Sequence, residues 1–249
     1  IVGLIATLPT RDTLTRVAVP SIAIQEKQLD SLVIVSDNAT LPASVVQAIE
    51  SLLPFIPIHV LNNTRAPGAA TAWNTGIEHI ANCWPEAYVA ILDDDDQWDS
   101  DHLQICENAA RTAGWPDVVV SGIRMSIDGD EVPRKPPMSL CIEDFLIGNP
   151  GWQGSNTFIR LNTLIKAGLF TEGLTSCNDR DLAIRVLSLN GCQFAFTGRH
   201  TASWNLDSGR PSLSSRRGEA KRAGLARFFA LHGHRMNETV RLRFFDRAK

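Results

Sequence analysis

The sequence has few cysteines, and they are not arranged as a disulfide framework. The five cysteines (Cys83, Cys106, Cys141, Cys177 and Cys192) are odd in number and widely spaced, and they contain no CxxC pair. Disulfide-bonded scaffolds need paired cysteines, and thiolate zinc sites need closely spaced ones. The pattern therefore argues against both kinds of site and favours a reducing compartment.

Long apolar runs are absent, and proline and glycine occur only at ordinary frequencies. No apolar stretch approaches the ~18 to 20 residues that a membrane-spanning helix needs. Thirteen prolines and 17 glycines are too few for a fibrous or low-complexity chain of 249 residues. Residues 1–8 are apolar but lack a basic region and a small-residue cleavage site, so they predict a strand rather than a signal peptide. We therefore expect a cytoplasmic globular protein.

Charge is unevenly distributed along the chain. The net charge is −3, but residues 214–249 contain ten Lys or Arg and three Asp or Glu, which gives +7, whereas residues 1–213 carry −10. An acidic body followed by a basic tail indicates two separate roles. We therefore divide the chain into a globular domain over residues 1–213 and a basic helical extension over residues 214–249.

Apolar strand-like runs alternate with segments of helical spacing. The predicted strands are at residues 1–8, 31–36, 58–61, 87–92 and 117–121. The predicted helices are at residues 13–28, 45–53, 69–80, 101–113 and 179–189. This alternation predicts an α/β fold, with a mostly parallel sheet flanked by helices on both faces of a single domain.

Polar residues follow each of the first four predicted strands. They are Thr10 and Arg11, Asp37 and Asn38, residues 62–65, and residues 93–96. Because ligands of open parallel sheets bind outside the carboxyl ends of the strands, we expect these side chains to converge.

The densest group of acidic residues follows the fourth strand. Six carboxylates lie between Asp93 and Asp101, with no base among them. If the strand continues, Asp93 and Asp95 share a face and could hold Mg²⁺ or Mn²⁺ with open positions for phosphate oxygens. A solvated acidic loop that caps the next helix is the alternative. A calcium EF-hand loop is excluded, because Trp98 stands where Gly is required and Gln104 where Glu is required.

Several ordered segments resemble family 2 glycosyltransferases, which are nucleotide-sugar enzymes with the GT-A fold. The run LDDDDQW at 92–98 resembles the DxD signature of that family. The other matching segments are VGLIATLPTR at 2–11, VIVSDNAT at 33–40, residues 63–77, and residues 154–186. Three positions depart from the family pattern: Ser36, Trp73 and Asn178.

The resemblance implies an inverting, metal-dependent transfer of a sugar from a nucleotide-diphosphate sugar, most readily a UDP-sugar, to a saccharide or other hydroxyl acceptor. It places the nucleotide-binding half at about residues 1–100 and the acceptor half at about 101–213. Asp179 would be the general base, with Asp181 as the neighbour that could replace it. Asp95, Asp93 and His200 would contact Mn²⁺ or Mg²⁺. The donor would contact Thr7, Pro9, Arg11, Asp37, Asn63, Gly68, Asn74, Asp93 and Asp94.

Structural alternatives remain for these residues and for the function. Asp37 and Asp179 could be turn or helix-cap residues, and His200 could be an ordinary surface or core histidine. An inactive GT-A-fold partner subunit is one rival function. A nucleotidyltransferase is another, although residues 9–12 lack the glycine-rich phosphate loop that such an enzyme would carry. The basic tail contains no recognisable nucleic-acid motif, so no nucleic-acid partner is expected.

The basic tail contains one further helical segment. Residues 219–231 place apolar side chains around Leu225, Phe228 and Phe229. Three alternatives are open for it: docking onto the acidic body or onto a second subunit in a homo-oligomer, peripheral contact with an anionic membrane, and plain solvation of a charged face.

Overall fold

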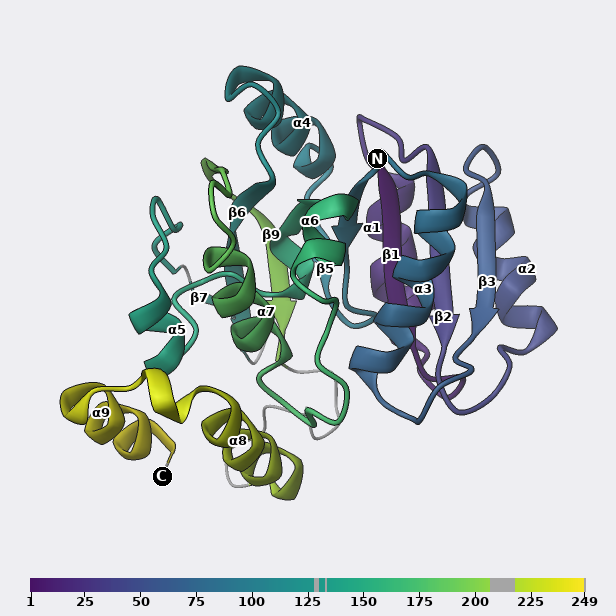
Figure 1. Ribbon diagram of the computed structural model, residues 1–249. Helices are drawn as coiled ribbons and strands as arrows, with labels where there is room; N and C mark the ends of the chain where they lie inside the picture. Colours follow the sequence, from purple (N-terminus) through teal and green to yellow (C-terminus); the bar gives the residue numbers. More distant parts are fainter. Residues whose placement is uncertain (128–129, 133, 207–217, 249) are drawn as a thin grey trace.

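A single sheet with helices on both faces organises the molecule (Figure 1). The computed structural model describes residues 1–127, 130–132, 134–206 and 218–248. The strands are β1 (Val2–Thr7), β2 (Ser31–Ser36), β3 (Ile58–Asn62), β4 (Tyr88–Ile91), β5 (Gln97–Trp98), β6 (Val118–Ile127), β7 (Asp130–Val132), β8 (Thr157–Arg160) and β9 (Phe194–Asn205). The α-helices are α1 (Val19–Ala23), α2 (Ala43–Leu52), α3 (Ala69–Cys83), α4 (His102–Thr112), α5 (Ile142–Ile147), α6 (Leu161–Lys166), α7 (Asn178–Leu187), α8 (Glu219–His232) and α9 (Glu238–Ala248). The short helices are the π-helix η1 (Leu14–Ala18) and the 3₁₀ helices η2 (Gly154–Asn156) and η3 (Gly233–Arg235).

The sheet has a parallel half and a mixed half. Its strand order over the described residues is β3-β2-β1-β4-β8-β6-β9-β5, with β7 paired to β6. The first four strands are all parallel. Strand β8 is antiparallel to both β4 and β6, and β9 is parallel to β6. The five predicted strands correspond to β1, β2, β3, β4 and β6, whereas β5, β7, β8 and β9 lie outside the predicted strands.

Both faces of the parallel half are buried, which explains its continuous apolar runs. In β2, Val33 and Val35 pack into the core on one face, while Leu32 and Ile34 pack into the core on the other. Successive side chains point to opposite faces of a strand, so a two-sided core leaves no position for polar alternation. Helix α3 covers the first face and η1, α1 and α2 cover the second.

The helix predicted over residues 13–28 is shorter in the structure and is joined to the acidic segment. It begins as the π-helix η1 and ends with α1 at Ala23. The side-chain amide of Gln25 then donates to the backbone carbonyl of Asp99 (2.7 Å), and its Oε1 accepts from the backbone N–H of Leu103 (3.1 Å). These hydrogen bonds satisfy the side-chain amide of Gln25 just beyond the end of α1. They also hold residues 99–103, at the end of the acidic run, in place.

The two C-terminal helices pack against the body of the molecule beside α5 and the segment that leads into α7 (Figure 1). Gly224 of α8 lies so close to Ser176 that an added Cβ would stand 2.3 Å from the Ser176 Oγ. Phe228 is fully buried, and the Arg180 guanidinium lies 4.2 Å from the centre of its ring. The apolar side of α8 is therefore part of the core.

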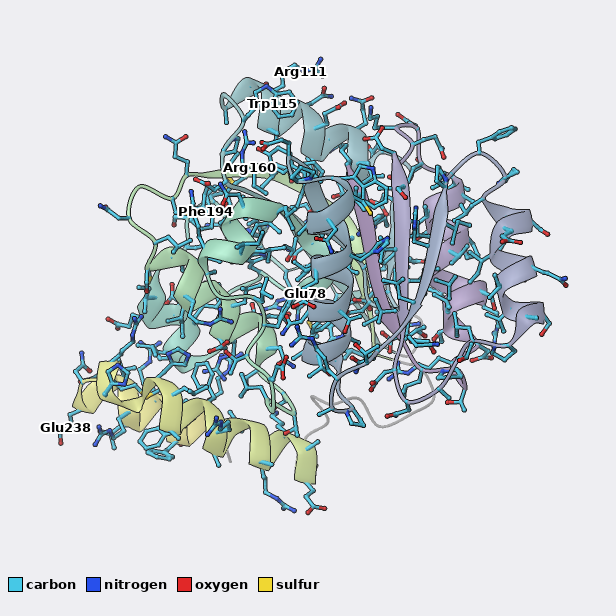
Figure 2. The ribbon with its side chains drawn as sticks, turned by 45° about the vertical axis from the view of Figure 1, so that its right-hand side comes forward. Glu78, Arg111, Trp115, Arg160, Phe194 and Glu238 are labelled. Carbon is cyan, nitrogen blue, oxygen red and sulfur yellow. The ribbon has the colours of Figure 1, made fainter. Side chains whose placement is uncertain are left out.

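The C-terminal helices lie at the end of the molecule where β1 and β2 terminate (Figure 1). Trp115 and Arg160 lie at the opposite end, far from Glu238 of α9 (Figure 2). In the part of the chain that the structure describes, no helix has the length and apolarity needed to cross a membrane.

Candidate active site

A pocket of about 690 Å³ lies at the carboxyl ends of β1, β2 and β4. This is the edge where ligands of parallel sheets bind. Most of the residues predicted for the site line it together: Thr7, Arg11, Asp37, Gly68, Asp93, Asp94, Asp95 and Asp179. The predicted convergence is therefore present for Arg11, Asp37, Asn38 and residues 93–96, whereas Thr10 and residues 62–65 do not line the pocket.

Four residues predicted for the site do not line the pocket, namely Pro9, Asn63, Asn74 and His200. Asn74 forms a reciprocal pair with the backbone of Phe170, with both hydrogen bonds at 2.9 Å. The imidazole of His200 contacts the backbone carbonyl of Arg134 through Nε2. The structure therefore does not bring His200 into contact with the acids, and Asn74 has a structural role in joining α3 to the loop before α7.

Asp37 connects the end of β2 to the start of α3. It accepts hydrogen bonds from the Asn63 side-chain amide (2.7 Å) and from the backbone N–H of Gly68 (2.8 Å). Gly68 has φ = 149°, a conformation that a residue with a side chain rarely adopts. Asp37 therefore has a structural role, because its hydrogen bonds hold the loop between β3 and α3. It also lines the pocket, so a ligand can reach it.

The four acids after β4 form a turn rather than an extension of the strand. Strand β4 ends at Ile91, and the backbone N–H of Asp96 donates to the carbonyl of Asp93 (3.1 Å). The premise that Asp93 and Asp95 share a strand face is therefore not met. All four carboxylates from Asp93 to Asp96 line the pocket because the turn brings them together there.

A single arginine neutralises part of this acidic turn. Arg11 Nη1 lies 3.0 Å from Asp94 Oδ1 and 2.9 Å from Asp95 Oδ2. Thr7 Oγ1 also donates to Asp94 (2.6 Å). Asp96 accepts from Ser155 Oγ (2.5 Å) and from the backbone N–H of Asn205.

Burial and mutual repulsion raise the pKa values of these carboxyl groups. Burial raises the pKa of Asp94 to about 6, against the opposing effect of Arg11. Burial and the charge of Asp95 raise the pKa of Asp96 to about 8. The pKa of Asp93 lies well above its ordinary value through burial and the charges of its acidic neighbours, Asp179 included. The acidic turn therefore brings together more carboxyl groups than Arg11 alone can balance when they ionise.

Asp179 lies in the first turn of α7 and faces Asp93. The backbone N–H of Gly154 donates to its carboxylate, and a Cβ on Gly154 would stand 3.0 Å from Asp93 Oδ1. The glycine therefore allows both acids to approach the same stretch of backbone. Burial raises the pKa of Asp179 to about 7, so the carboxyl group can take up and release a proton near neutral pH.

Asp181, the alternative base, points away from the pocket and is fully engaged. Its Oδ1 lies 2.8 Å from His232 Nε2 on α8, and its Oδ2 accepts from Arg185 Nη2 (2.6 Å). Burial acts to raise the pKa of Asp181, but the hydrogen bonds from His232 and Arg185 outweigh it and hold the pKa below its ordinary value. Asp181 therefore fastens α8 to α7 and does not reach the pocket.

We expect Asp181→Asn to destabilise the fold by about 3 kcal/mol, the scale for removing one partner of a buried ion pair. A lowered pKa means that the ionised form stabilises the fold. The difference in the free energy of unfolding between wild type and variant should therefore have its full size above pH ~4. It should shrink as the pH falls through the pKa of Asp181 in the folded protein. Urea unfolding at pH 7 and pH 3 measures it. Asp101→Asn, which loses only an exposed pair with Arg199, is the control. An equal effect of the two variants would contradict this role.

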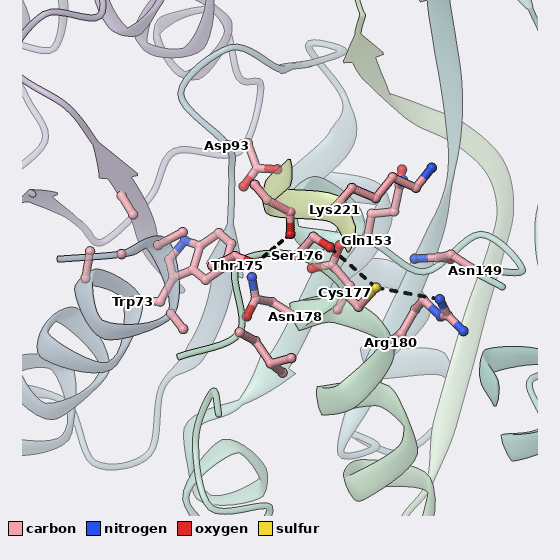
Figure 3. Close-up of a pocket in the computed structure, with 18 of the residues that line it drawn as sticks. Trp73, Asp93, Asn149, Gln153, Thr175, Ser176, Cys177, Asn178, Arg180 and Lys221 are labelled. Atoms are coloured by element: carbon pink, nitrogen blue, oxygen red, sulfur yellow. Dashed lines mark hydrogen bonds between the residues drawn. The ribbon is translucent and has the colours of Figure 1, made fainter. Parts of the chain in front are cut away.

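The opposite wall of the pocket is lined by residues that were not among the predicted site residues, although Arg180 lies within the segment 154–186 that resembles the family. Its lining includes Asn149, Gln153, Arg180, Lys221 and Arg247. Figure 3 shows Trp73 on one side, and Asn149, Arg180 and Lys221 on the other. For Lys221 and Arg247 the sequence signal was the positive charge of residues 214–249, which does not say which cations face the pocket. For Arg180 it was the position next to the predicted base Asp179.

Two buried polar atoms of the pocket lining, Trp73 Nε1 and Asn178 Oδ1, lack a hydrogen-bond partner among the described residues. Leaving such atoms unpaired is costly, so their presence in the lining indicates ligand contacts. Trp73 and Asn178 are two of the positions that depart from the family pattern.

The acidic turn suits a hard divalent cation through its chemistry, although not as a complete protein cage. Its donors are carboxylate oxygens with an unbalanced negative charge, which Mg²⁺ and Mn²⁺ prefer. Among the described ranges, no group of three or more His, Cys, Asp or Glu side chains is placed to hold an ion. A cation here would use one or two carboxylates, with Asp93 and Asp95 as candidates, and ligand oxygens would supply the rest.

Comparison with known proteins bears on the family and on the fold. The family model described as "Glycosyl transferase family 2" matches residues 12–176. No curated protein matches the sequence.

Solved structures of S. aureus TarS share the architecture. The crystal structure of TarS 1–349 is 14% identical, with a TM-score of 0.67 over 99% of this chain and 70% of that chain. TarS 1–349 in complex with UDP-GlcNAc is 13% identical, with a TM-score of 0.65 over 99% of this chain and 78% of that one. The complex with UDP is 15% identical, with a TM-score of 0.62 over 91% and 65%. The predicted GT-A fold is confirmed.

Proposed function

The chain belongs to glycosyl transferase family 2 and is a glycosyltransferase, and from this premise we propose that it transfers a sugar from a UDP-sugar to an acceptor hydroxyl with inversion. The observation that carries the proposal is the pocket itself. One cavity contains the Asp37 side chain, the acidic turn at residues 93–96, and the carboxyl group of Asp179, whose pKa is raised to about 7. The presence of all these acids also supports an active enzyme over an inactive partner subunit.

The donor nucleotide would bind along the wall formed by Asp37, Gly68 and Trp73. A carboxylate can accept a hydrogen bond from a ring N–H or a ribose hydroxyl, and the unpaired Trp73 Nε1 can donate one. Arg11, at the end of β1, would contact phosphate oxygens from its position beside the acidic turn. The TarS structures in complex with UDP-GlcNAc and with UDP support UDP as the nucleotide.

Asp93 and Asp95 would hold Mn²⁺ or Mg²⁺ together with the donor diphosphate. When bound, such a cation offsets the diphosphate charge and stabilises the leaving group. Without it, several acids would face a diphosphate across a partly buried pocket. The charge balance of this chain's own residues is therefore our reason for proposing that the enzyme depends on a metal ion.

Asp179 would take the proton from the acceptor hydroxyl. It lies on the α7 side of the pocket and faces Asp93. An acceptor held there would attack the sugar from the side opposite the departing diphosphate, which gives inversion. Asn178 Oδ1, buried and unpaired beside Asp179, would accept a hydrogen bond from a sugar or acceptor hydroxyl.

A donor screen by thermal unfolding tests this function. We expect UDP-sugars to stabilise the protein by about 2.7 kcal/mol at a concentration of 100 times Kd. For a chain of this size, that corresponds to a Tm increase of roughly 5 to 10 °C. GDP-, dTDP- and CMP-sugars are the comparison ligands, each with and without Mn²⁺. The proposal fails if no nucleotide sugar raises the Tm, and UDP is the wrong nucleotide if another base gives the larger shift.

A further inference from the structure

Three arginines converge on residues 145–149, at the α5 end of the pocket. The Arg247 guanidinium lies against Gly148, where an added Cβ would stand 2.8 Å from its Cζ and Nε. Arg134 Nη2 donates to the backbone carbonyl of Asn149 (3.0 Å). Arg180 donates through Nε and Nη2 to the carbonyls of Phe145 and Leu146, both at 2.9 Å. Backbone carbonyls therefore orient two of the three guanidinium groups, and the missing Cβ of Gly148 makes room for the third.

The positive charge of this cluster is not balanced by carboxylates. Among the described residues, none of the three arginines is within ion-pair distance of an Asp or Glu. Burial, followed by the charge of Arg247, lowers the pKa of Arg134, and the same two effects contribute to the lowered pKa of Arg180. Guanidinium groups stay protonated, so an anion bound near them would relieve their mutual repulsion.

The part of this cluster that reaches the pocket includes groups suited to a hydroxylated anion. Arg180, Lys221 and Arg247 line the pocket. Asn178, also in the lining, has a buried Oδ1 without a partner among the described residues. Cations recognise phosphate oxygens, whereas an unpaired amide oxygen accepts from a hydroxyl.

We propose that this wall, lined by Arg180, Lys221 and Arg247 and with Arg134 on the neighbouring Asn149 carbonyl, is an anion subsite that binds a phosphate ester on the acceptor. The inference deepens the proposed function, because it names the chemical class of the acceptor at the same site. A hydroxylated phosphate ester can contact Arg247 and Lys221 with its phosphate while a hydroxyl reaches toward Asp179.

The donor diphosphate is the other source of phosphate, and the arrangement of the pocket argues against it. The nucleotide wall with Trp73 lies across the pocket from Asn149, Arg180 and Lys221, and Asp93 lies between them (Figure 3). A donor that extends from Asp37 to the acidic turn would place its diphosphate beside Arg11. The arginine cluster is then left for a second ligand.

Titration of glycerol 3-phosphate into the protein by calorimetry, at low ionic strength and with saturating UDP, tests the subsite. We expect binding by the wild type and none of uncharged glycerol. Arg247→Gln and Lys221→Gln should each weaken glycerol 3-phosphate binding by about tenfold, the scale of one charge-assisted hydrogen bond. Arg243→Gln and Arg222→Gln, exposed arginines of the same two helices outside the lining, are the matched controls and should bind as wild type does.

The UDP affinity of each protein separates this inference from the proposed function. We expect the Arg247 and Lys221 variants to bind UDP as tightly as the wild type does. Displacement of glycerol 3-phosphate by UDP would assign the arginines to the donor diphosphate and overturn the inference. Equal binding of glycerol 3-phosphate by Arg247→Gln and Arg243→Gln would also overturn it. A wild type that binds glycerol 3-phosphate but no UDP would contradict the proposed function and leave the anion site standing.

Discussion

Asp179→Asn should reduce the rate of sugar transfer by ~10² or more while leaving donor affinity unchanged. The substitution keeps the size of the side chain and its contact with the Gly154 backbone, but an amide cannot take the proton from the acceptor hydroxyl. Release of UDP from a UDP-sugar measures the rate, with water as the acceptor where none is supplied, and calorimetry with UDP measures donor binding.

Asp181→Asn is the matched control, because it changes the neighbouring acid of the same helix. Its carboxylate is occupied by His232 and Arg185 and does not line the pocket. We expect it to lower stability with little loss of turnover at temperatures where it stays folded. If Asp181→Asn lost turnover and Asp179→Asn kept it, the two roles would be reversed.

Asp95→Ala should remove the Mn²⁺-dependent part of UDP affinity, with a loss of at least ~10² in the presence of metal. Substitution of groups that merely support metal ligands costs 10- to 100-fold, and a direct ligand should cost no less. Calorimetry with UDP, with Mn²⁺ and with chelator, measures this effect. Asp99→Ala changes an acid of the same run that pairs with Arg124 outside the pocket, and it should bind UDP as the wild type does.

The ion pair between Asp95 and Arg11 provides the competing explanation, and chelator separates the two. If Asp95 only neutralises Arg11, its removal frees the guanidinium for phosphate. Metal-free UDP binding would then become tighter and metal would make no difference. That result, or a wild type with full turnover in chelator, would contradict metal dependence.

The parallel half of the sheet and its ligand edge could be predicted from the sequence, because each strand there is buried on both faces. Val33 and Val35 on one face and Leu32 and Ile34 on the other give an uninterrupted apolar run. The polar residues Asp37 and Asp93 then come directly after such runs. Because Asp37 and Asp93 directly follow two parallel strands, their positions in the sequence were enough to place both at the same edge of the sheet.

The opposite wall of the pocket, with Arg180, Lys221 and Arg247, could not be predicted in the same way, because it depends on contacts between distant segments. Arg247 reaches the pocket only because α9 packs on α5, about a hundred residues earlier in the chain. Phe228 and Gly224 dock α8 beside Ser176, a contact that helical spacing within residues 219–231 does not specify. The basic segment that precedes α8, residues 207–217, lies outside the described residues.

Local pattern was also insufficient where tertiary hydrogen bonds decide the geometry. The acids after β4 turn because Asp96 bonds to Asp93, Ser155 and Asn205, and the last two lie far away in the sequence. His200 stands in register with Gly122 across the β6–β9 pair, where its ring lies close to the Gly122 backbone. Its role as a metal contact stays a prediction that this arrangement does not support.

A crystal structure of the protein with UDP and Mn²⁺ would show whether this pocket is a nucleotide-sugar site. We expect the uridine against Asp37, Gly68 and Trp73, the diphosphate beside Arg11 and the acidic turn, and the arginine cluster at Gly148 free of UDP. UDP bound elsewhere, or with its diphosphate on Arg247 and Lys221, would contradict this expectation.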